Sequence, residues 1–275
     1  MIGALHSELF RLVRRRMPWV LLGTLGAVIA LLYLLLWLSL EGAQDVVTAE
    51  GGAEEIREML TLREVAGGSG IGLVYVVAGI MTVIMSASIV ATEYVWGTIR
   101  TILPRTRGRG AFLAAKLAVI AGFALVVSVT GMLSALAASG AVTALAGLDA
   151  GLGADFVLRM LGSVALTFVA LLPYASLAFL VAVLSRSTAG GVAVGLAMFF
   201  VEGQFVLLLS AAGGFVEATT NALLTPNVSA VISLGGPDAE PARTVGRGFA
   251  VVGAYTLVPA ALALWRFRRR DVLLN

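Results

Sequence analysis

Long apolar runs separated by short polar segments dominate the chain. A helix that crosses a membrane needs about 20 mostly apolar residues, and six runs reach or approach that length. These runs are residues 19–40, 72–92, 117–139, 156–184, 188–212 and 249–265. With 59% hydrophobic and 13% charged residues, the 275-residue chain has more apolar surface than one soluble core could bury. The pattern predicts an all-α polytopic membrane protein with six transmembrane helices.

An amphipathic segment, residues 1–17, precedes the first span. Its apolar positions follow helical spacing, and its arginines fall largely on another face. The apolar positions are Leu5, Leu9, Leu12 and Val13, and the arginines are Arg11, Arg14, Arg15 and Arg16. We expect an N-terminal interfacial helix here, with Pro18 turning the chain into the membrane.

Three longer segments connect the predicted spans. Residues 41–71 are predicted as an external loop, which includes a short amphipathic helix over residues 53–65. Residues 93–112 are predicted as a cytoplasmic coupling loop between spans two and three. Residues 213–246 contain apolar stretches, and we expect an external re-entrant hairpin there, because a broken backbone at membrane depth needs protein to cover it.

The distribution of charge orients these segments. With the N and C termini cytoplasmic, 14 of the 19 Lys and Arg residues fall in inner segments and five in outer ones. Of the 16 Asp and Glu residues, 12 fall in outer segments, three in inner segments, and Glu202 lies within the fifth span. This arrangement follows the positive-inside rule. The basic pI of 9.7 therefore reflects inner loops that face anionic lipid, and we expect no nucleic acid partner.

The residue types exclude several kinds of chemistry. The chain has no cysteine and a single histidine, His6, which excludes disulfides, thiolate metal sites and a Ser/His dyad. Its only lysine, Lys116, lies between Ala115 and Leu117 rather than in the Gly-Lys-Ser/Thr of a phosphate-binding loop. We therefore expect no catalytic residue, no metal and no cofactor in this chain, and no enzyme activity of its own.

The segment from Glu93 to Lys116 interrupts the apolar runs with four arginines and the only lysine. A Gly-Thr pair breaks a helix that then stops at Leu103-Pro104, which predicts a short coupling helix at the cytoplasmic interface. Such a helix, tied to two spans, moves with them as a unit. Glu93 is predicted either as a helix-end carboxylate that reaches the interface or as an ion-pair partner of an arginine in this segment or of a separate ATPase.

This segment resembles the corresponding region of ABC-2 type permeases, the membrane subunits of ATP-binding-cassette exporters. The family's pattern is a glutamate, Gly-Thr, a leucine followed closely by Pro-x-Ser/Thr-Arg, and a lysine that opens the next span. The matching residues are Glu93, Gly97, Thr98, Leu103, Pro104, Arg105, Thr106, Arg107 and Lys116. Residues 267–273 are also similar to the usual ending of the family. An importer permease motif is less similar, because its spacing is longer and Tyr94-Val95 replace its alanines.

The resemblance implies a single transmembrane permease domain over residues 1–275, paired with a second permease subunit as a homodimer or heterodimer. Separate cytosolic ATPase subunits would bind ATP and Mg and drive export of a hydrophobic or amphiphilic substrate, such as a drug, lipid or peptide. The location implied is a prokaryotic cell (inner) membrane. The ATPase-coupling residues would be Glu93, Gly97, Thr98, Arg100, Leu103, Pro104, Arg105 and Arg107.

Candidate residues for the translocation path lie in the second and fifth spans, which line the path in exporters of this shape. They are Met81, Met85, Phe199, Glu202 and Phe205. A carboxylate inside a bilayer costs about 2.5 to 3.5 kcal/mol on insertion scales, so Glu202 should be paired, protonated or beside a wet cavity. The alternatives are ordinary helix packing for the Met and Phe residues, and snorkelling to the outer interface for Glu202. For a small-residue pair in the fifth span, Gly191 and Gly195, chance is the favoured account.

Two other functions stay open on the sequence. An ABC-linked immunity or sensory membrane protein would bind a peptide through the acidic external loop. A stand-alone membrane channel or enzyme would act without an ATPase and would need titratable residues that converge inside the membrane. Glu202 is the one residue in the predicted spans that fits this requirement.

Overall fold

The computed structural model of the protein describes residues 2–42, 60–97, 108–146, 153–211, 221–236 and 240–269. Within these ranges every regular element is a helix. The elements are α1 (Ile2–Arg14), α2 (Arg16–Gly42), α5 (Leu62–Gly67), α6 (Ser69–Val95), α8 (Arg109–Ala146), α9 (Phe156–Ser185), α10 (Thr188–Ala211), α12 (Leu224–Ile232), the short 3-10 helix η3 (Ser233–Gly235) and α13 (Ala242–Arg269).

Six of the described helices, α2, α6, α8, α9, α10 and α13, are each long and apolar enough to cross a membrane. They coincide with the six predicted apolar runs. Over the described residues, the prediction of an all-α chain with six helices suited to crossing a membrane is therefore confirmed. The segment ahead of the first span also forms a helix, α1, which is separated from α2 by a single non-helical residue, Arg15.

Several predicted features fall wholly or partly outside the described residues. The expected coupling helix lies at residues 98–107, which are outside them. Only the end of the expected external helix at residues 53–65 is described, and there the chain makes a bend before α5 begins. In the segment 213–246, the described part contains α12 and η3, and α12 packs against α13.

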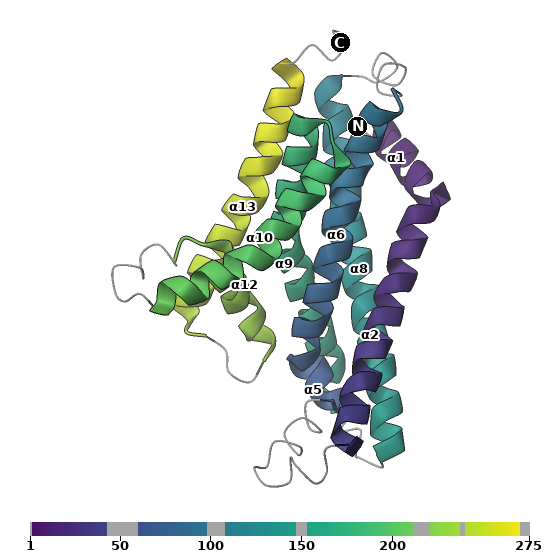
Figure 1. Ribbon diagram of the computed structural model, residues 1–275, viewed down its shortest axis with the longest axis vertical. Coiled ribbons are helices and arrows are strands. Elements are labelled where there is room, and N and C mark those ends of the chain that lie inside the picture. Colours follow the sequence, from purple (N-terminus) through teal and green to yellow (C-terminus); the bar gives the residue numbers. More distant parts are fainter. Residues whose placement is uncertain are drawn as a thin grey trace.

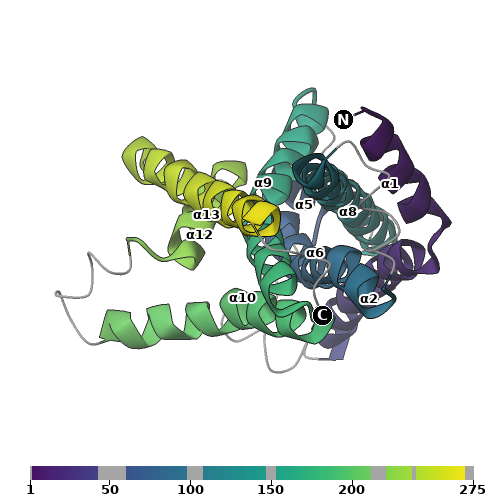
Figure 2. The same ribbon diagram turned by 90° about the horizontal axis from the view of Figure 1, so that it is seen from above.

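Two groups of helices meet at α6 and α9 in the centre of the molecule (Figures 1 and 2). Helices α2 and α8 pack against α6 on one side, while α10, α12 and α13 gather around α9 on the other. One large core cluster of apolar residues draws mainly on α2, α6, α8 and α9, and a second draws mainly on α9, α10, α12 and α13. Because α9 contributes to both clusters, it holds the two groups together.

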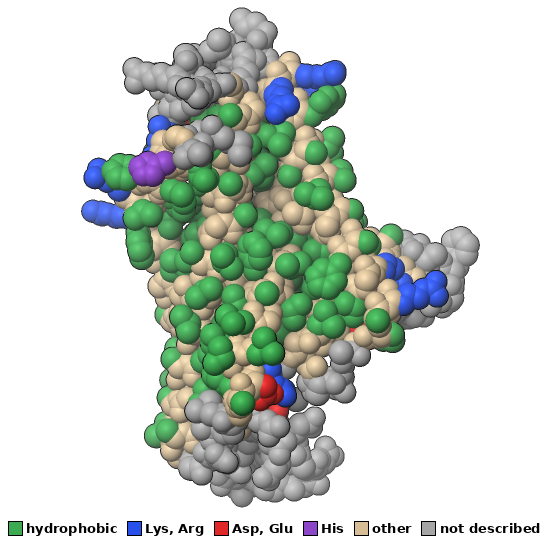
Figure 3. All heavy atoms as spheres, turned by 180° about the vertical axis from the view of Figure 1, so that it is seen from behind, with side chains coloured by type: hydrophobic (Ala, Val, Ile, Leu, Met, Phe, Trp, Pro, Cys, Tyr) green, Lys and Arg blue, Asp and Glu red, His purple; other side chains and the backbone are tan. Residues whose placement is uncertain are grey.

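The N-terminal end of α1 and the C-terminal end of α13 lie at the same end of the helical bundle (Figure 1). The C-terminal end of α6 and the N-terminal end of α8 reach this end as well. Figure 3 shows Lys and Arg side chains towards this end, apolar side chains over the middle of the molecule, and further Lys and Arg side chains on the projecting part and beside acidic ones near the opposite end. Helices α2, α10 and α13 leave most of their apolar residues exposed or only partly buried, as expected for surfaces that contact lipid or another apolar partner.

Helix α10 approaches α6 and α9 closely where two glycines replace side chains. A Cβ atom at Gly191 would lie 2.8 Å from the carbonyl oxygen of Ala178 and 2.8 Å from the Cβ of Ala87. A Cβ atom at Gly195 would lie 2.6 Å from a methyl group of Val83. The pair is therefore not a chance feature of a glycine-rich chain, because atoms of α6 and α9 occupy the space that a side chain at either position would need.

We predict that Gly191→Ala and Gly195→Ala each lower the free energy of unfolding by about 1–3 kcal/mol, the usual cost of overpacking a filled interior. Gly162→Ala is the matched control, because nothing lies within 4 Å of a Cβ at that helical position. Its effect should be at most about 1 kcal/mol and stabilising, since Ala favours the helix over Gly. Reversible unfolding in detergent micelles measures all three. Equal stability of the three variants would contradict the close-contact account.

Candidate functional site

The predicted coupling segment begins where α6 ends, and the structure shows how this helix is terminated. The backbone of Gly97 has a φ of +67°, and its N–H donates to the carbonyl oxygen of Tyr94. Glycine suits this left-handed position after a helix terminus because it has no Cβ. The rest of the predicted coupling set lies outside the described residues. These residues are Thr98, Arg100, Leu103, Pro104, Arg105 and Arg107.

A buried ammonium group joins the helices on the two sides of this segment. Lys116 of α8 is fully buried, and its Nζ donates to Glu93 Oε1 of α6 at 2.6 Å and to the carbonyl oxygen of Ile89 at 3.1 Å. The third hydrogen bond goes to Glu8 Oε2 of α1 at 2.9 Å. An ammonium group has three protons to donate. All three are therefore used, and each bond reaches a helix other than α8.

Arg11 completes this group, which we call the ion cluster: Glu8, Arg11, Glu93 and Lys116. The guanidinium of Arg11 donates to Glu8 Oε1 at 3.2 Å and lies 3.9 Å from Glu93 Oε1. Glu8 and Glu93 are 6% and 1% exposed, so both carboxylates are desolvated. Two positive and two negative charges balance within the cluster. Pairing of this kind offsets the high cost of removing ions from water.

The ion cluster changes the interpretation of Glu93. The sequence suggests a carboxylate at the interface, or one paired with an arginine of the coupling segment or with an ATPase, whereas the structure pairs it with Lys116 and, at 3.9 Å, with Arg11 of α1. Sequence reasoning missed Glu8 and Arg11 as partners. Glu8 gave one signal, because it stands three residues after Leu5 and four before Leu12, on the apolar face of α1. An acidic residue on such a face indicates a buried partner.

Glu202 of α10 forms a second buried polar contact, with α12. One carboxylate oxygen accepts the backbone N–H of Leu224 at 2.7 Å, and the other accepts the N–H and hydroxyl of Thr225 at 3.2 and 2.9 Å. The N-cap residue of α12 is Leu223, which has no side-chain oxygen to offer. Glu202 therefore supplies, from another helix, the capping oxygens that the first turn of α12 needs.

A comparison with known proteins identifies the family. Residues 55–273 match a family described as "Protein of unknown function (DUF2705)". The chain belongs to this family. No curated protein matches it. The matched region of this DUF2705 member contains Glu93, Lys116 and Glu202, whereas Glu8 and Arg11 lie before it.

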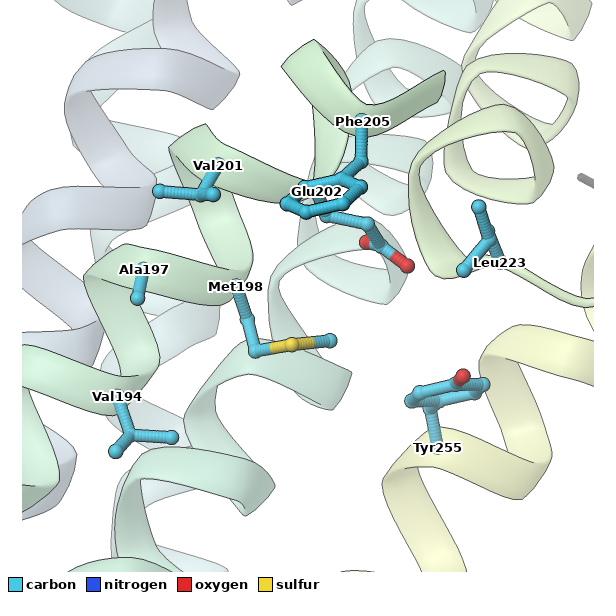
Figure 4. A pocket seen from close by; sticks show the side chains of 8 residues that line it. All are labelled: Val194, Ala197, Met198, Val201, Glu202, Phe205, Leu223 and Tyr255. Carbon is cyan, nitrogen blue, oxygen red and sulfur yellow. The ribbon is translucent and has the colours of Figure 1, made fainter. Parts of the chain in front are cut away.

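A largely apolar pocket of about 380 Å³ lies beside Glu202, where α10 faces α13 and the chain entering α12. Its lining residues are Val194, Ala197, Met198, Val201, Glu202, Phe205, Leu223 and Tyr255. Figure 4 shows the Glu202 carboxylate pointing between Phe205 and Leu223, with the Tyr255 ring across the space. The pocket thus combines apolar walls with a single carboxylate, a combination suited to an amphiphilic ligand.

The five candidate path residues fall into two groups in the structure. Met81 and Met85 belong to the larger core cluster, and Phe199 packs against the rings of Tyr75 and Tyr174 with centroids 5.0 and 4.8 Å away. These three have packing contacts inside the chain. Glu202 and Phe205 instead line the pocket, and Phe205 is more than half exposed there. Their place in a transport path stays a prediction.

The described residues contain no group of three or more His, Cys, Asp or Glu side chains that could hold a metal ion. The buried carboxylates of the described residues are Glu8 and Glu93 in the ion cluster and Glu202 at α12. Both sites bind helices to one another through buried charge.

We predict that Lys116→Met lowers the free energy of unfolding by about 3–5 kcal/mol, because it leaves two buried carboxylates without their main counter-ion. Combining it with Glu8→Gln and Glu93→Gln should recover much of this loss, since the triple variant buries no carboxylate at the site. Unfolding in detergent micelles measures both. Arg159→Ala is the control: it breaks an ion pair whose side chains are more than half exposed, and such a pair contributes about 1 kcal/mol or less. Failure of the triple variant to regain stability would contradict the electrostatic explanation.

Proposed function

We propose that this chain is the membrane permease subunit of an ABC-2 type exporter. It forms the translocation path with a second permease subunit, and separate cytosolic ATPase subunits supply ATP hydrolysis. The observation that carries the proposal is the ion cluster, because it fastens together the two helices that flank the coupling segment, α6 and α8, together with the amphipathic helix α1. A loop held in this way transmits a push to all three helices at once.

The packing of α6 against α10 extends this mechanical connection towards the pocket. Ala87 and Val83 of α6 meet Gly191 and Gly195 of α10 with no room for a side chain between them. Further along α10, Glu202 binds the start of α12. Closure of the ATPase pair on ATP would press on the coupling segment, tilt α6, and so move α10 and the pocket beside it. Coupling of this kind is reciprocal, so substrate should also alter ATPase activity.

Charge supports the orientation that this mechanism needs. The end of the bundle that carries both chain ends also carries the basic residues of α1 and the arginines in the last turn of α13. The positive-inside rule favours the cytoplasm for this end. The coupling segment would then face cytosolic ATPase subunits, and the membrane would be a prokaryotic cell (inner) membrane. The exposed apolar faces of α2, α10 and α13 offer surfaces to the second permease subunit and to lipid.

Isolation of the affinity-tagged chain from its native host tests the proposal. We expect an ATP-binding-cassette subunit to be recovered with it in stoichiometric amount. Replacing Arg100 and Arg105 together by Glu should weaken that association at least about tenfold, which corresponds to about 1.4 kcal/mol, because both arginines belong to the coupling segment. Quantitative mass spectrometry of the recovered complex measures the ratio of the two chains.

The matched control for this experiment is Arg159→Glu combined with Arg243→Glu, which reverses two charges in the first turns of α9 and α13, at the helix ends predicted to lie on the external side. Recovery of the ATPase with this control should equal that with the unsubstituted chain. Reproducible absence of any ATP-binding-cassette subunit from the recovered complex would contradict the exporter proposal. Equal recovery with the Arg100/Arg105 variant would instead limit those two arginines to setting membrane topology.

We predict that Glu202→Leu changes the dependence of ATPase activity on substrate in the reconstituted complex. The variant removes the acceptor for three donors at α12, and each unsatisfied buried donor costs about 1–3 kcal/mol. Glu202→Gln keeps an acceptor oxygen and should change the profile less. The measurement is ATPase activity in proteoliposomes over a range of amphiphilic compounds. An unchanged profile in both variants would separate Glu202 from transport and leave it a structural cap.

A further inference from the structure

An apolar groove of about 320 Å³ lies where α1 and α2 meet α8, well away from the Glu202 pocket. Its lining residues are Leu9, Leu12, Val13, Pro18, Trp19, Leu22, Val119, Gly122, Phe123 and Val126. None of these side chains is charged. Several are exposed, including Val13 at 58% and Trp19 at 60%, so the groove opens to the surroundings of the bundle.

The groove is held open by contacts of its own walls. The indole N–H of Trp19 in α2 donates to the carbonyl oxygen of Val13 in α1 at 2.8 Å. This bond satisfies one of the carbonyl groups that the end of α1 leaves without a partner. On the other side, the ion cluster ties Glu8 of α1 to Lys116 of α8. The three walls are therefore fixed relative to one another without any ligand.

Three consecutive arginines, Arg14, Arg15 and Arg16, connect the two walls formed by α1 and α2. Within the described part of the chain none of the three makes an ion pair, whereas Arg11 is used in the ion cluster. The guanidinium groups of Arg14 and Arg15 lie over the rings of Phe10 and Trp96, at 4.2 and 5.8 Å. Three positive charges without an ion-pair partner among the described residues thus lie between Val13 and Pro18, two residues that line the groove.

We propose that this groove binds one acyl chain of an anionic phospholipid, whose phosphate headgroup is held by Arg14, Arg15 and Arg16. Guanidinium groups bind phosphate oxygens in a two-pronged geometry, and a net negative headgroup is attracted to clustered arginines more strongly than a zwitterionic one. A volume of about 320 Å³ lies at the small end of the range for ligand pockets, which suits a single chain rather than a protein helix. The site does not depend on whether the chain works with an ATPase.

Trp19 is a natural probe of this site, because it lines the groove. A variant with Trp37, Trp96 and Trp265 replaced by Phe retains Trp19 as the only tryptophan of the full-length chain. It is reconstituted in phosphatidylcholine vesicles that contain a fixed fraction of either dibrominated phosphatidylglycerol or dibrominated phosphatidylcholine. Bromine atoms in the acyl chain quench indole fluorescence on contact. We expect phosphatidylglycerol to occupy the groove about fivefold more strongly, the order of magnitude that one arginine near a membrane surface supplies.

Arg14→Gln, Arg15→Gln and Arg16→Gln together should remove the preference and give equal quenching by the two lipids. A second single-tryptophan variant that retains Trp37, near the opposite end of α2, is the matched control and should show no preference. If the triple variant does not fold, salt gives the same test on the unsubstituted arginines. At about 1 M salt the Debye length falls to about 3 Å, and the preference should disappear.

Three results would overturn the proposal. Quenching of Trp19 in proportion to lipid fraction, without preference, would mean that only bulk lipid fills the groove. A preference that persists in the triple variant and at high salt would exclude the arginines as the headgroup site. Absence of quenching by either lipid would mean that protein, such as a second copy of this chain, covers Trp19.

Discussion

Burial of a charge among membrane-spanning helices requires other charges and hydrogen-bonding groups to replace the lost water. Lys116 meets this requirement in full, since each of its three protons has an acceptor. Two of these acceptors are carboxylates on different helices, so one ammonium group fixes the positions of α1, α6 and α8. The docking of α1 depends on Glu8 in this cluster. The lipid groove proposed between α1, α2 and α8 in turn depends on that docking.

Glu202 satisfies the same requirement with dipoles instead of a counter-ion. Its two oxygens accept backbone and hydroxyl groups at the start of α12, where the N–H groups carry the positive end of the helix dipole. The contact satisfies the buried carboxylate and also the N–H groups at the start of α12, for which Leu223 offers no side-chain cap. As a consequence α12 is held between α10 and α13, and a polar contact fixes one edge of the pocket in addition to the apolar core residues of α12.

The sequence predicts the six spans well but their ends poorly, for a physical reason. An apolar run, from which a span is predicted, ends at the first charged residue, whereas the helix itself continues wherever that charge has a partner or reaches water. Residues 117–139 were predicted as the third span, yet α8 begins at Arg109 and includes Lys116, whose charge is paired inside the bundle. The cap on α12 could not be predicted, because backbone N–H groups leave no sequence signal. Glu8 could have been suspected from its place on an apolar face.

The contacts that α10 makes with α6 and α12 determine how a movement of α6 in the proposed mechanism would change the pocket. Where Gly191 and Gly195 meet α6, side-chain atoms of Ala87 and Val83 fill the space beside the α10 backbone, so a tilt of α6 would carry that half of α10 with it. Beyond this region Glu202 fastens α10 to α12. Across the pocket, the hydroxyl of Tyr255 reaches the carbonyl oxygen of Ala222 only at 3.5 Å. Helix α12 also packs closely on α13, where a Cβ atom at Gly248 would lie 2.8 Å from the carbonyl oxygen of Asn227. Movement driven through α6 would therefore displace α10 relative to the pair α12 and α13 and change the pocket between them, with the Glu202 contact as the link that resists it.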